Sequence, residues 1–589
     1  MQVMFKVWYC SGISLLILFY AFSPFRMEKG FIFQIQAESL VFVTALSWVG
    51  STVLFIKKNC ITYILKTLTR IDLLAVAFLI YLLLQLIFYR ADREYILTIV
   101  SLSAVYFLFR CIPKKLVVGL LVLLPVLVGV QIIYGYNRFE YPWQTLSDNT
   151  GAFNNTGIFG GFGAMGFVSA LGLLISSKKL VFRIALGIFL LPIIIQLVYS
   201  HSRAAWVAAV VGTIVLLIPA FRKLTRQKIN VIISILLIAG VFFSIKLYHF
   251  KQNSAEGRLL IWTVSWNMLK EKPLTGFGPG GFRENYPLRQ GDYFKNHPDS
   301  HFSDLADDIG YPFNEFLKTG IEQGFIGLIL MIGILFLAFS NNSSPPVLRA
   351  VLAALVGFSC FSYPFDVVAF QVLGVFCLAG IASTQKRVAI ASSTSNSLKT
   401  PVIADLTRNP LKLIATGLII AFCGVVLFFS FNYFNDVKKW NQIIRSYSFG
   451  NEKQITEFQN LYPVFQHNDK FVFIYGKALY DSRRYAEAIP LLETAKEIFP
   501  HTQTLITLGE AFEKTGEYSK ALENWETASY IRPSLFKPHY NMAKLYFNLK
   551  NYAQARQQAR AVLNKKIKID NPEIDRMKRE CLNWLASDP

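Results

Sequence analysis

The sequence contains little charge for its length. Charged residues make up 16% of its 589 positions, whereas soluble proteins average about 25%. Hydrophobic residues make up 53%. A chain of this length has room for several soluble domains, but a composition so poor in charge and so rich in apolar residues favours a membrane protein instead.

Cysteine is scarce as well. The seven cysteines form no CxxC pair, so neither a zinc knuckle nor a disulfide framework is expected. The glycine-rich stretch GFGPGG at 276–281 is not a P-loop, because it lacks the GK[ST] ending and follows no evident strand. We expect a turn there, and neither a metal ion nor an organic cofactor in the protein.

Apolar segments close to the ~20 residues that cross ~30 Å of hydrocarbon recur along the chain. Thirteen of them lie at roughly 4–23, 39–57, 72–89, 94–111, 115–135, 156–176, 180–199, 205–221, 229–248, 322–340, 347–363, 366–384 and 411–433. The predicted fold is therefore all-α, with a polytopic membrane bundle of about thirteen spans.

The net charge of +22 raises the question of a nucleic-acid partner. The basic residues instead gather in alternate connections between the apolar segments, among them Lys57, Lys178, Lys179 and Lys386. Under the positive-inside rule these connections stay cytoplasmic, which places the N-terminus inside and, after an odd number of spans, the C-terminus outside. The charge thus predicts topology in an inner membrane, with membrane lipids as partners and no nucleic acid.

One long external segment and one internal linker divide the chain. The external segment covers about 249–320, and long loops tend to be functional. The linker, 386–410, includes the Ser/Thr-rich stretch ASSTSNSLKTP. We therefore predict a membrane domain over 1–385 with an external cap, a last span at 411–433, and a periplasmic domain over 435–589.

The C-terminal domain repeats with a period of 33 or 34 residues. Tyr485, Tyr518 and Tyr552 recur at this spacing, and alanines keep constant offsets from them. Over about 470–563 the units resemble tetratricopeptide repeats, helical hairpins that stack into a solenoid. Such solenoids commonly present a peptide groove, so we expect a protein acceptor or an assembly partner there, although a stack that merely folds is the simpler alternative.

Two arginines fall on the predicted outer edge of the bundle. Arg203 follows Ser202 at a tight turn between two spans, and Arg258 lies near the start of an amphipathic helical pattern that includes Trp262 and Trp266. A single arginine at the edge of a membrane bundle often has no further role than to extend its side chain to the membrane–water interface. Two guanidiniums on one side suit an anionic lipid headgroup, because each carries a fork of donors that matches phosphate oxygens.

Several short motifs follow one another in a fixed order. They are GAFNNTG at 151–157, SRAAW at 202–206, GRLLIW at 257–262, GFGPGGF at 276–282, NEFL at 314–317 and EQGFIG at 322–327. In this order and with this sidedness they are similar to the O-antigen ligase family, which also includes O-antigen polymerases and bacterial O-oligosaccharyltransferases. The resemblance covers roughly residues 70–385.

The resemblance implies a metal-independent glycosyltransferase that takes a glycan from undecaprenyl diphosphate on the periplasmic face and hands it to an acceptor. Arg203 and Arg258 match the family's arginines, which would bind the diphosphate and stabilise the charge that develops as it leaves. Four further candidates, for substrate binding, are Ser202, Trp262, Asn154 and Glu322. Glu322 has a structural alternative, since it could satisfy backbone groups around neighbouring glycines.

The sequence departs from the family at Phe313. Ligases of the family usually have a histidine here, immediately before Asn or Asp, as the base for the acceptor hydroxyl; in this chain Phe313 precedes Asn314, which we count with Glu315 as catalytic candidates. Glu315 could take the proton, though a carboxylate of ordinary pKa ~4.3 is a weak base and needs burial for the role. His297 or His301 could fold back into the site, or the leaving diphosphate could reduce the need for a strong base.

Each of these candidates has a simpler reading. Glu315 could only cap the helix that re-enters the membrane, and His297 and His301 could be solvated loop residues. The aspartates near the two histidines also admit a divalent-cation site, although none is expected.

Several activities fit the motifs and the tail. Transfer to Ser or Thr of an exported protein is favoured over transfer to a lipid A core sugar, because a lipid acceptor needs no peptide groove. A polymerase that extends the lipid-linked glycan is a third variant. The missing histidine also admits a non-catalytic scaffold or a transporter of the lipid-linked glycan, although a transporter would need charged residues inside its spans.

Overall fold

The computed structural model describes residues 68–112, 114–137, 145–222, 251–385, 410–446, 451–567 and 571–586, with a few isolated positions besides. Throughout these segments the secondary structure is helical and no strand occurs, so the predicted all-α class is confirmed. The apolar segments predicted at 4–23, 39–57 and 229–248, and nearly all of the linker, lie outside the described residues.

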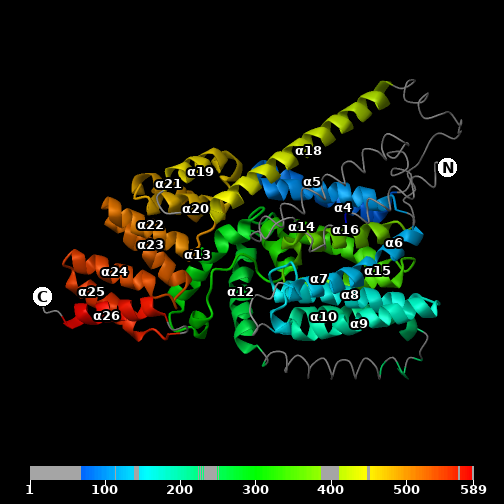
Figure 1. Ribbon diagram of the computed structural model, residues 1–589, viewed down its shortest axis with the longest axis horizontal. Helices are drawn as coiled ribbons and strands as arrows, with labels where there is room; N and C mark the ends of the chain where they lie inside the picture. The colour runs from blue at the N-terminus through cyan, green and yellow to red at the C-terminus, as the bar shows by residue number, and fades with distance from the viewer. Residues whose placement is uncertain are drawn as a thin grey trace.

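Six segments of the described chain are helical, long and apolar enough to cross a membrane. They are α4 (Arg70–Phe88), the stretch Leu116–Tyr136 made of α6 (Lys114–Leu120) and α7 (Leu123–Tyr136), α8 (Thr156–Ser176), α9 (Leu180–Tyr199), α10 (Arg203–Phe221) and α14 (Glu315–Ser340). Together with α5 (Arg93–Arg110), α15 (Pro346–Ser359) and α16 (Val368–Ala382) they lie alongside one another in Figure 1. The protein is thus a multi-pass membrane protein, while the total of thirteen spans remains a prediction.

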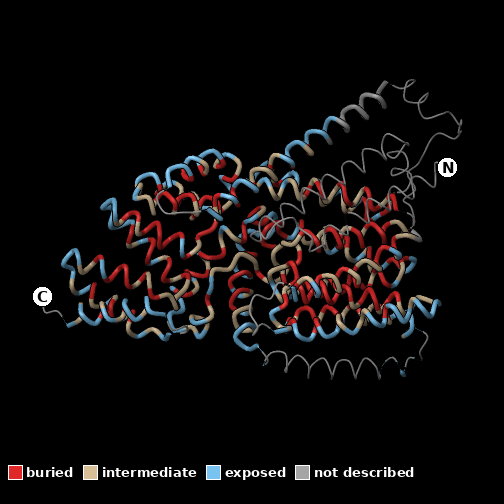
Figure 2. Tube along the Cα trace, in the orientation of Figure 1, coloured by how far each residue is buried: buried red, intermediate tan, exposed pale blue. Residues whose placement is uncertain are grey.

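Close packing in the bundle joins α8, α10 and α15. Glycines let these helices approach one another, as small residues do between membrane helices. A Cβ on Gly212 would lie 2.9 Å from the carbonyl oxygen of Ala350, and one on Gly161 would lie 2.4 Å from the ring of Phe358. Figure 2 shows the buried core that runs through the bundle, whereas α9 presents exposed apolar side chains, as a lipid-facing helix would.

The chain breaks the helical geometry of α14 at Gly324, whose φ of 66° and ψ of −170° lie outside the helical region. The glycine-rich segment before α13 bonds to carbonyls beside the break: the N–H of Phe277 donates to Ile321 O at 2.8 Å, and the N–H of Gly278 donates to Glu322 O at 2.9 Å. The GFGPGG stretch therefore forms a structural turn fastened to a broken helix.

Residues 251–314 form a cap at one end of the bundle. α12 (Gln252–Glu271) stands across the direction of the bundle helices in Figure 1, and α13 (Gly281–Asn296) and the short η2 (His301–Asp304) follow it. The apolar side of α12 is buried inside the cap, in a cluster that comprises Leu260, Ile261, Val264, Met268, Leu269, Phe277, Phe282, Tyr286, Phe294, Ala306 and Ile321. The amphipathic pattern around Arg258 thus serves to pack the cap onto itself and onto α14.

The C-terminal part of the chain is a row of short helices. α18 (Pro410–Arg445) covers the predicted last span and continues unbroken past 435, where Val437 and Trp440 join the core of the following helices. These helices, which we call the tail, are α19 (Glu452–Phe465), α20 (Asp469–Asp481), α21 (Tyr485–Ile498), α22 (Thr502–Thr515), α23 (Tyr518–Ile531), α24 (Lys537–Asn548), α25 (Tyr552–Asn564) and α26 (Pro572–Ala586). Three successive hairpins, α20–α21, α22–α23 and α24–α25, occupy the repeat positions. Their identity as tetratricopeptide repeats remains a prediction.

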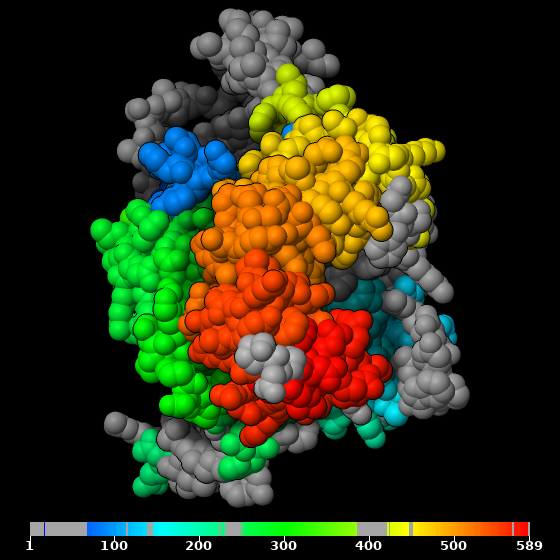
Figure 3. Space-filling view, turned by 90° about the vertical axis from the view of Figure 1, so that its left-hand side faces the viewer, coloured from blue at the N-terminus to red at the C-terminus, as the bar shows by residue number. Residues whose placement is uncertain are grey.

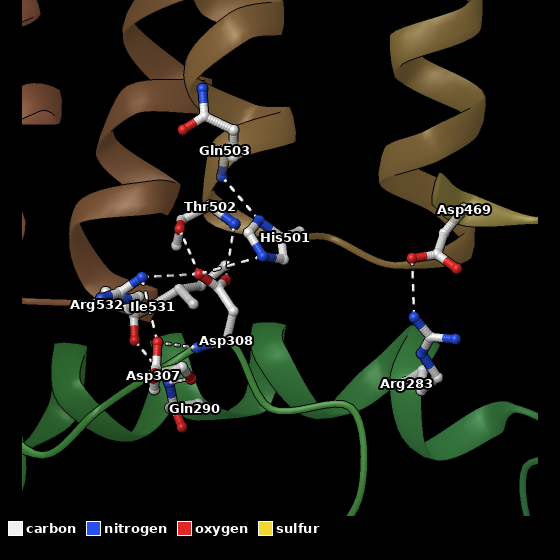
Figure 4. Close-up of polar contacts among 10 residues, drawn as sticks. All are labelled: Arg283, Gln290, Asp307, Asp308, Asp469, His501, Thr502, Gln503, Ile531 and Arg532. Carbon is white, nitrogen blue, oxygen red and sulfur yellow. Dashed lines mark hydrogen bonds and ion pairs between the residues drawn. The ribbon is translucent and has the colours of Figure 1, made fainter. Parts of the chain in front are cut away.

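The tail lies against the cap, as the view of this end of the molecule in Figure 3 shows. Asp308, whose side chain is 3% exposed, occupies the centre of the contact in Figure 4. It accepts hydrogen bonds from the N–H of Thr502 at 2.8 Å and from Thr502 Oγ1 at 2.6 Å, and it pairs with Arg532 at 3.2 Å. Its charge thus sits at the N-terminus of α22, where the helix dipole favours an anion.

Two further contacts fasten α13 to the tail. Gln290, which is fully buried, donates to Ile531 O at 2.7 Å, and Arg283 pairs with Asp469 at 2.8 Å. α13 consequently contacts the cap core on one side and the tail on the other, so the position of the tail is tied to that of the cap.

We predict that Asp308→Ala loosens the tail from the cap. Three groups of the tail lose an acceptor, and leaving buried donors unpaired costs roughly 1–3 kcal/mol. Hydrogen exchange of α13 and α22 should rise in the variant. The matched control is Asp299→Ala, because Asp299 is exposed and contributes nothing to this contact. Equal exchange in both variants would contradict the assigned role of Asp308.

Candidate functional site

Arg203 lies where the chain turns from α9 into α10. Ser202 is the N-cap of α10: its Oγ accepts from the N–H of Ala205 at 3.3 Å and donates to Gly157 O at 3.4 Å. Arg203, the first residue of the helix, donates from Nη2 to Ser254 Oγ at 3.2 Å. Ser202 therefore fixes the start of the helix, and Arg203 reaches across to the first turn of α12.

The start of α12 supplies two more cations. Lys251 is the N-cap residue, and its Nζ donates to His201 O at 3.2 Å. Arg258 lies two turns further along the same helix, with its Cζ 5.1 Å from the centre of the Phe313 ring. The N-terminal ends of α10 and α12 therefore meet, each with the positive end of its helix dipole and with basic side chains.

The positive charges of Arg203, Lys251 and Arg258, which we call the cation cluster, repel one another. Burial, and then the charge of Arg203, lower the pKa of the Arg258 guanidinium to about 10. Burial also lowers the pKa of Lys251, and Arg203 and Arg258 lower it further. No carboxylate of the described chain forms an ion pair with Lys251 or Arg258. An arrangement of this kind is unfavourable when empty and favours a ligand with negative charge.

Aromatic side chains form the wall beside Arg258. Phe313 adopts a φ of 54° and packs edge-on against Tyr311 and Tyr363 at 5.0 and 5.6 Å between ring centres. Tyr311 and Tyr363 stack at 3.8 Å. Trp262 fixes the backbone next to Phe313, because its Nε1 donates to Pro312 O at 2.9 Å. Phe313 is thus a packing partner of Arg258.

The start of α14 holds the other acidic and amide candidates. Asn314 is the N-cap and accepts from the N–H groups of Phe316 and Leu317, both at 3.0 Å. Glu315 is 3% exposed, and its Oε1 accepts from the N–H of Phe365 at 2.8 Å. Glu322 is also buried, about two turns further on, beside the break in the helix.

The remaining candidates from the sequence are His297, His301 and Asn154. His297 is exposed and bonds through Nδ1 to the carbonyl oxygen of Tyr293 in its own helix. His301 lies 3.5 Å from Glu256, which precedes Arg258 by half a turn on α12. Asn154 has a φ of 52° and lines a large cavity that also borders Phe313. Within the described residues no group of His, Cys, Asp or Glu side chains is arranged to hold a metal ion.

The aromatic wall borders a cavity of about 1740 Å³. Tyr311, Phe313 and Tyr363 line it, and so do Glu315 and Glu322. It extends from the bundle, along α5 and α14, to the tail. The structure thus brings Arg203, Lys251 and Arg258 close together beside Phe313, whereas both glutamates line the cavity and neither arginine does.

Lys251, Tyr311 and Tyr363 did not stand out in the sequence. Lys251 could have been found, because it precedes Arg258 by seven residues and so shares a face of an amphipathic helix with it. No sequence signal marks the two tyrosines, since their stacking joins segments that lie 52 residues apart.

These features describe a multi-pass membrane protein with a cationic site at the junction of two helix starts. Residues 187–332 match the family model described as O-Antigen ligase. The match contains Arg203, Lys251, Arg258, Phe313 and Glu322 and indicates a ligase- or polymerase-type glycosyltransferase family. No curated protein matches the chain.

We predict opposite effects of Lys251→Gln on stability and on anion binding. Removing one of three mutually repelling charges should raise the unfolding temperature of the ligand-free protein. Pyrophosphate, used as a probe, should bind roughly tenfold more weakly, because a charged hydrogen bond contributes about 1.5–3 kcal/mol. Thermal shift titrations measure both quantities.

The control for this variant is Lys178→Gln, which makes the same change of charge at an exposed position outside the cluster. A lowered unfolding temperature in Lys251→Gln, or unchanged protection by pyrophosphate, would count against a strained cation cluster.

Proposed function

We propose that the protein is a glycosyltransferase that moves a glycan from undecaprenyl diphosphate to an acceptor hydroxyl on the periplasmic face of the inner membrane. One observation carries the proposal: Arg203, Lys251 and Arg258 converge at two helix N-termini, and Lys251 and Arg258 have no ion-pair partner among the described residues. Diphosphate is the ligand that this arrangement of donors and charge favours.

In the proposed reaction the acceptor oxygen bonds to the anomeric carbon of the glycan as the bond from that carbon to the diphosphate oxygen breaks. The electron pair of the broken bond leaves with undecaprenyl diphosphate, whose negative charge increases. The cation cluster stabilises this charge without reorganisation, because its members are already in place. The proton of the acceptor hydroxyl passes to a base, and no metal ion is required.

We propose Glu315 as the base. Glu315 has the burial that a carboxylate needs for this role, and it lines the same cavity as Phe313, the residue at the family's histidine position. Its second oxygen is left for the acceptor, because the N–H of Phe365 occupies Oε1. His301 is the alternative, since it contacts Glu256 near Arg258, whereas His297 bonds to its own helix.

The acceptor remains a choice between a protein, a lipid A core sugar and the lipid-linked glycan itself. The tail packs directly on the cap. This contact supports a role of the tail at the reaction site more than a role in recruiting a partner elsewhere. A non-catalytic scaffold is the second candidate function, and the replacement of the family's histidine by Phe313 favours it.

We expect Arg203→Ala and Arg258→Ala each to lower kcat/KM for a lipid diphosphate donor by roughly 10²–10³, the loss seen when one transition-state donor is removed. The measurement is release of glycan from the radiolabelled donor by purified protein. Arg222→Ala is the control, because Arg222 lies at the opposite end of α10. Near-normal turnover by both site variants would refute the role of the cluster.

The base is tested by Glu315→Gln, His301→Ala and His297→Ala. Glu315→Gln keeps an oxygen for the Phe365 N–H, so we expect an intact fold and a loss in kcat of roughly 10²–10⁴ with little change in KM. Both histidine variants should retain activity. Loss in His301→Ala alone would assign the base to His301, and retention in all three would mean that departure of the diphosphate needs no strong base.

A further inference from the structure

The tail forms part of the wall of the large cavity. Eleven of its residues line the space, among them Tyr462, Lys470, Glu497 and Phe499. Opposite them stand the beginning of α5 and the beginning of α13, and Arg93 donates to Pro463 O at 3.1 Å where α5 meets the tail. The volume of about 1740 Å³ exceeds that of a drug-sized pocket, about 300–1000 Å³, and has room for several sugar rings.

The charge of this cavity is opposite to that of the cation cluster. Among its described lining residues, eleven are Asp or Glu and five are Lys or Arg. Six of these carboxylates form no ion pair with a described residue: Asp92, Glu94, Glu284, Glu315, Glu322 and Glu497. Such a surface disfavours phosphates and uronic acids, and its carboxyl oxygens accept hydrogen bonds from hydroxyl groups.

Apolar side chains make up much of the remaining lining, and aromatic and cationic groups lie among them. Tyr95 from α5, Tyr311 from the cap and Tyr462 from the tail offer ring faces and hydroxyl groups from three different segments. Burial lowers the pKa of the Lys470 ammonium to about 8. Rings that cover the apolar face of a sugar, with polar groups at its edge, are the general means by which proteins hold amphipathic ligands.

We propose that the tail binds glycan directly: Tyr462, Lys470 and Glu497 form, with the beginnings of α5 and α13, one wall of a site for a neutral, hydroxyl-rich oligosaccharide. The inference rests on the proposed function, in which such a glycan is either the transferred chain or a sugar acceptor. The aromatic wall of Tyr311, Phe313 and Tyr363 then separates the hydroxyl-rich part of the substrate from the diphosphate beside Arg258.

Binding to the full-length protein in detergent tests the site without any assay of transfer. The probes are maltotriose, chitotriose and mannotriose as neutral oligosaccharides and trigalacturonic acid as an anionic one, observed by saturation-transfer difference NMR. We expect binding of at least one neutral trisaccharide and none of the anionic one. Glu497→Gln should weaken that binding roughly tenfold, as loss of one charged hydrogen bond does, and Tyr462→Leu should weaken it because the ring face and the hydroxyl group are lost.

The matched control is Glu523→Gln, because Glu523 is exposed on α23 and does not line the cavity. Binding of trigalacturonic acid alone, binding of no neutral trisaccharide, or equal affinity in wild type and both cavity variants would overturn the proposal.

Kinetics then separate the two sources of the sugar. A raised KM of Glu497→Gln for the lipid-linked donor assigns the cavity to the transferred glycan, and a raised KM for the acceptor assigns it to the acceptor; unchanged values for both would overturn a role in the reaction. Failure of the proposed function looks different, because the wild-type protein would then transfer no glycan, or Arg203→Ala and Arg258→Ala would retain transfer, while trisaccharide binding still responded to Glu497→Gln.

Discussion

The break in α14 is the constraint on which the rest of the structure depends. A helix that leaves its regular path at Gly324 exposes backbone groups that must be satisfied, above all close to a membrane. The segment before α13 meets this requirement through Phe277 and Gly278, and Tyr81 of α4 adds a hydrogen bond to Gln323 O at 2.6 Å. The cap is thereby fastened to the bundle, and α13 takes the position from which it holds the tail.

The same contact organises the candidate site. Because the cap is fixed on α14, α12 brings Lys251 and Arg258 to the start of α10, where Arg203 lies. The beginning of α14 then carries Phe313 against Arg258. The result is a division of charge, with three neighbouring cations beside Phe313 and a carboxylate-rich cavity that Phe313 also lines. A substrate with a diphosphate at one end and hydroxyl groups beyond it matches this division.

The tail shares in this arrangement because it is fixed at two places. α18 continues from the predicted last span into the core of the tail, and the contacts of Asp308 and Gln290 hold the middle helices on the cap. The segment from Asp308 to Phe313 is only six residues long, so the tail and the aromatic wall constrain each other. A tail that only recruited a protein partner would not need to pack on the cap. A tail that forms part of the wall of a substrate cavity does need this contact.

The sequence by itself determined the all-α class, the apolar segments and the motifs around Arg203, Arg258 and Phe313, because hydropathy and helical periodicity are local properties of the chain. It also indicated a turn at GFGPGG and repeat units in the tail. Only the tertiary structure decided that Lys251 joins the arginines, that Tyr363 stacks on Tyr311 and that the tail lines a cavity, since these contacts join segments far apart in the sequence. The acidic character of that cavity was equally hidden, because its carboxylates come from α4, α5, the cap, α14, the segment before α16 and the tail, and no linear pattern records which of them the fold brings together.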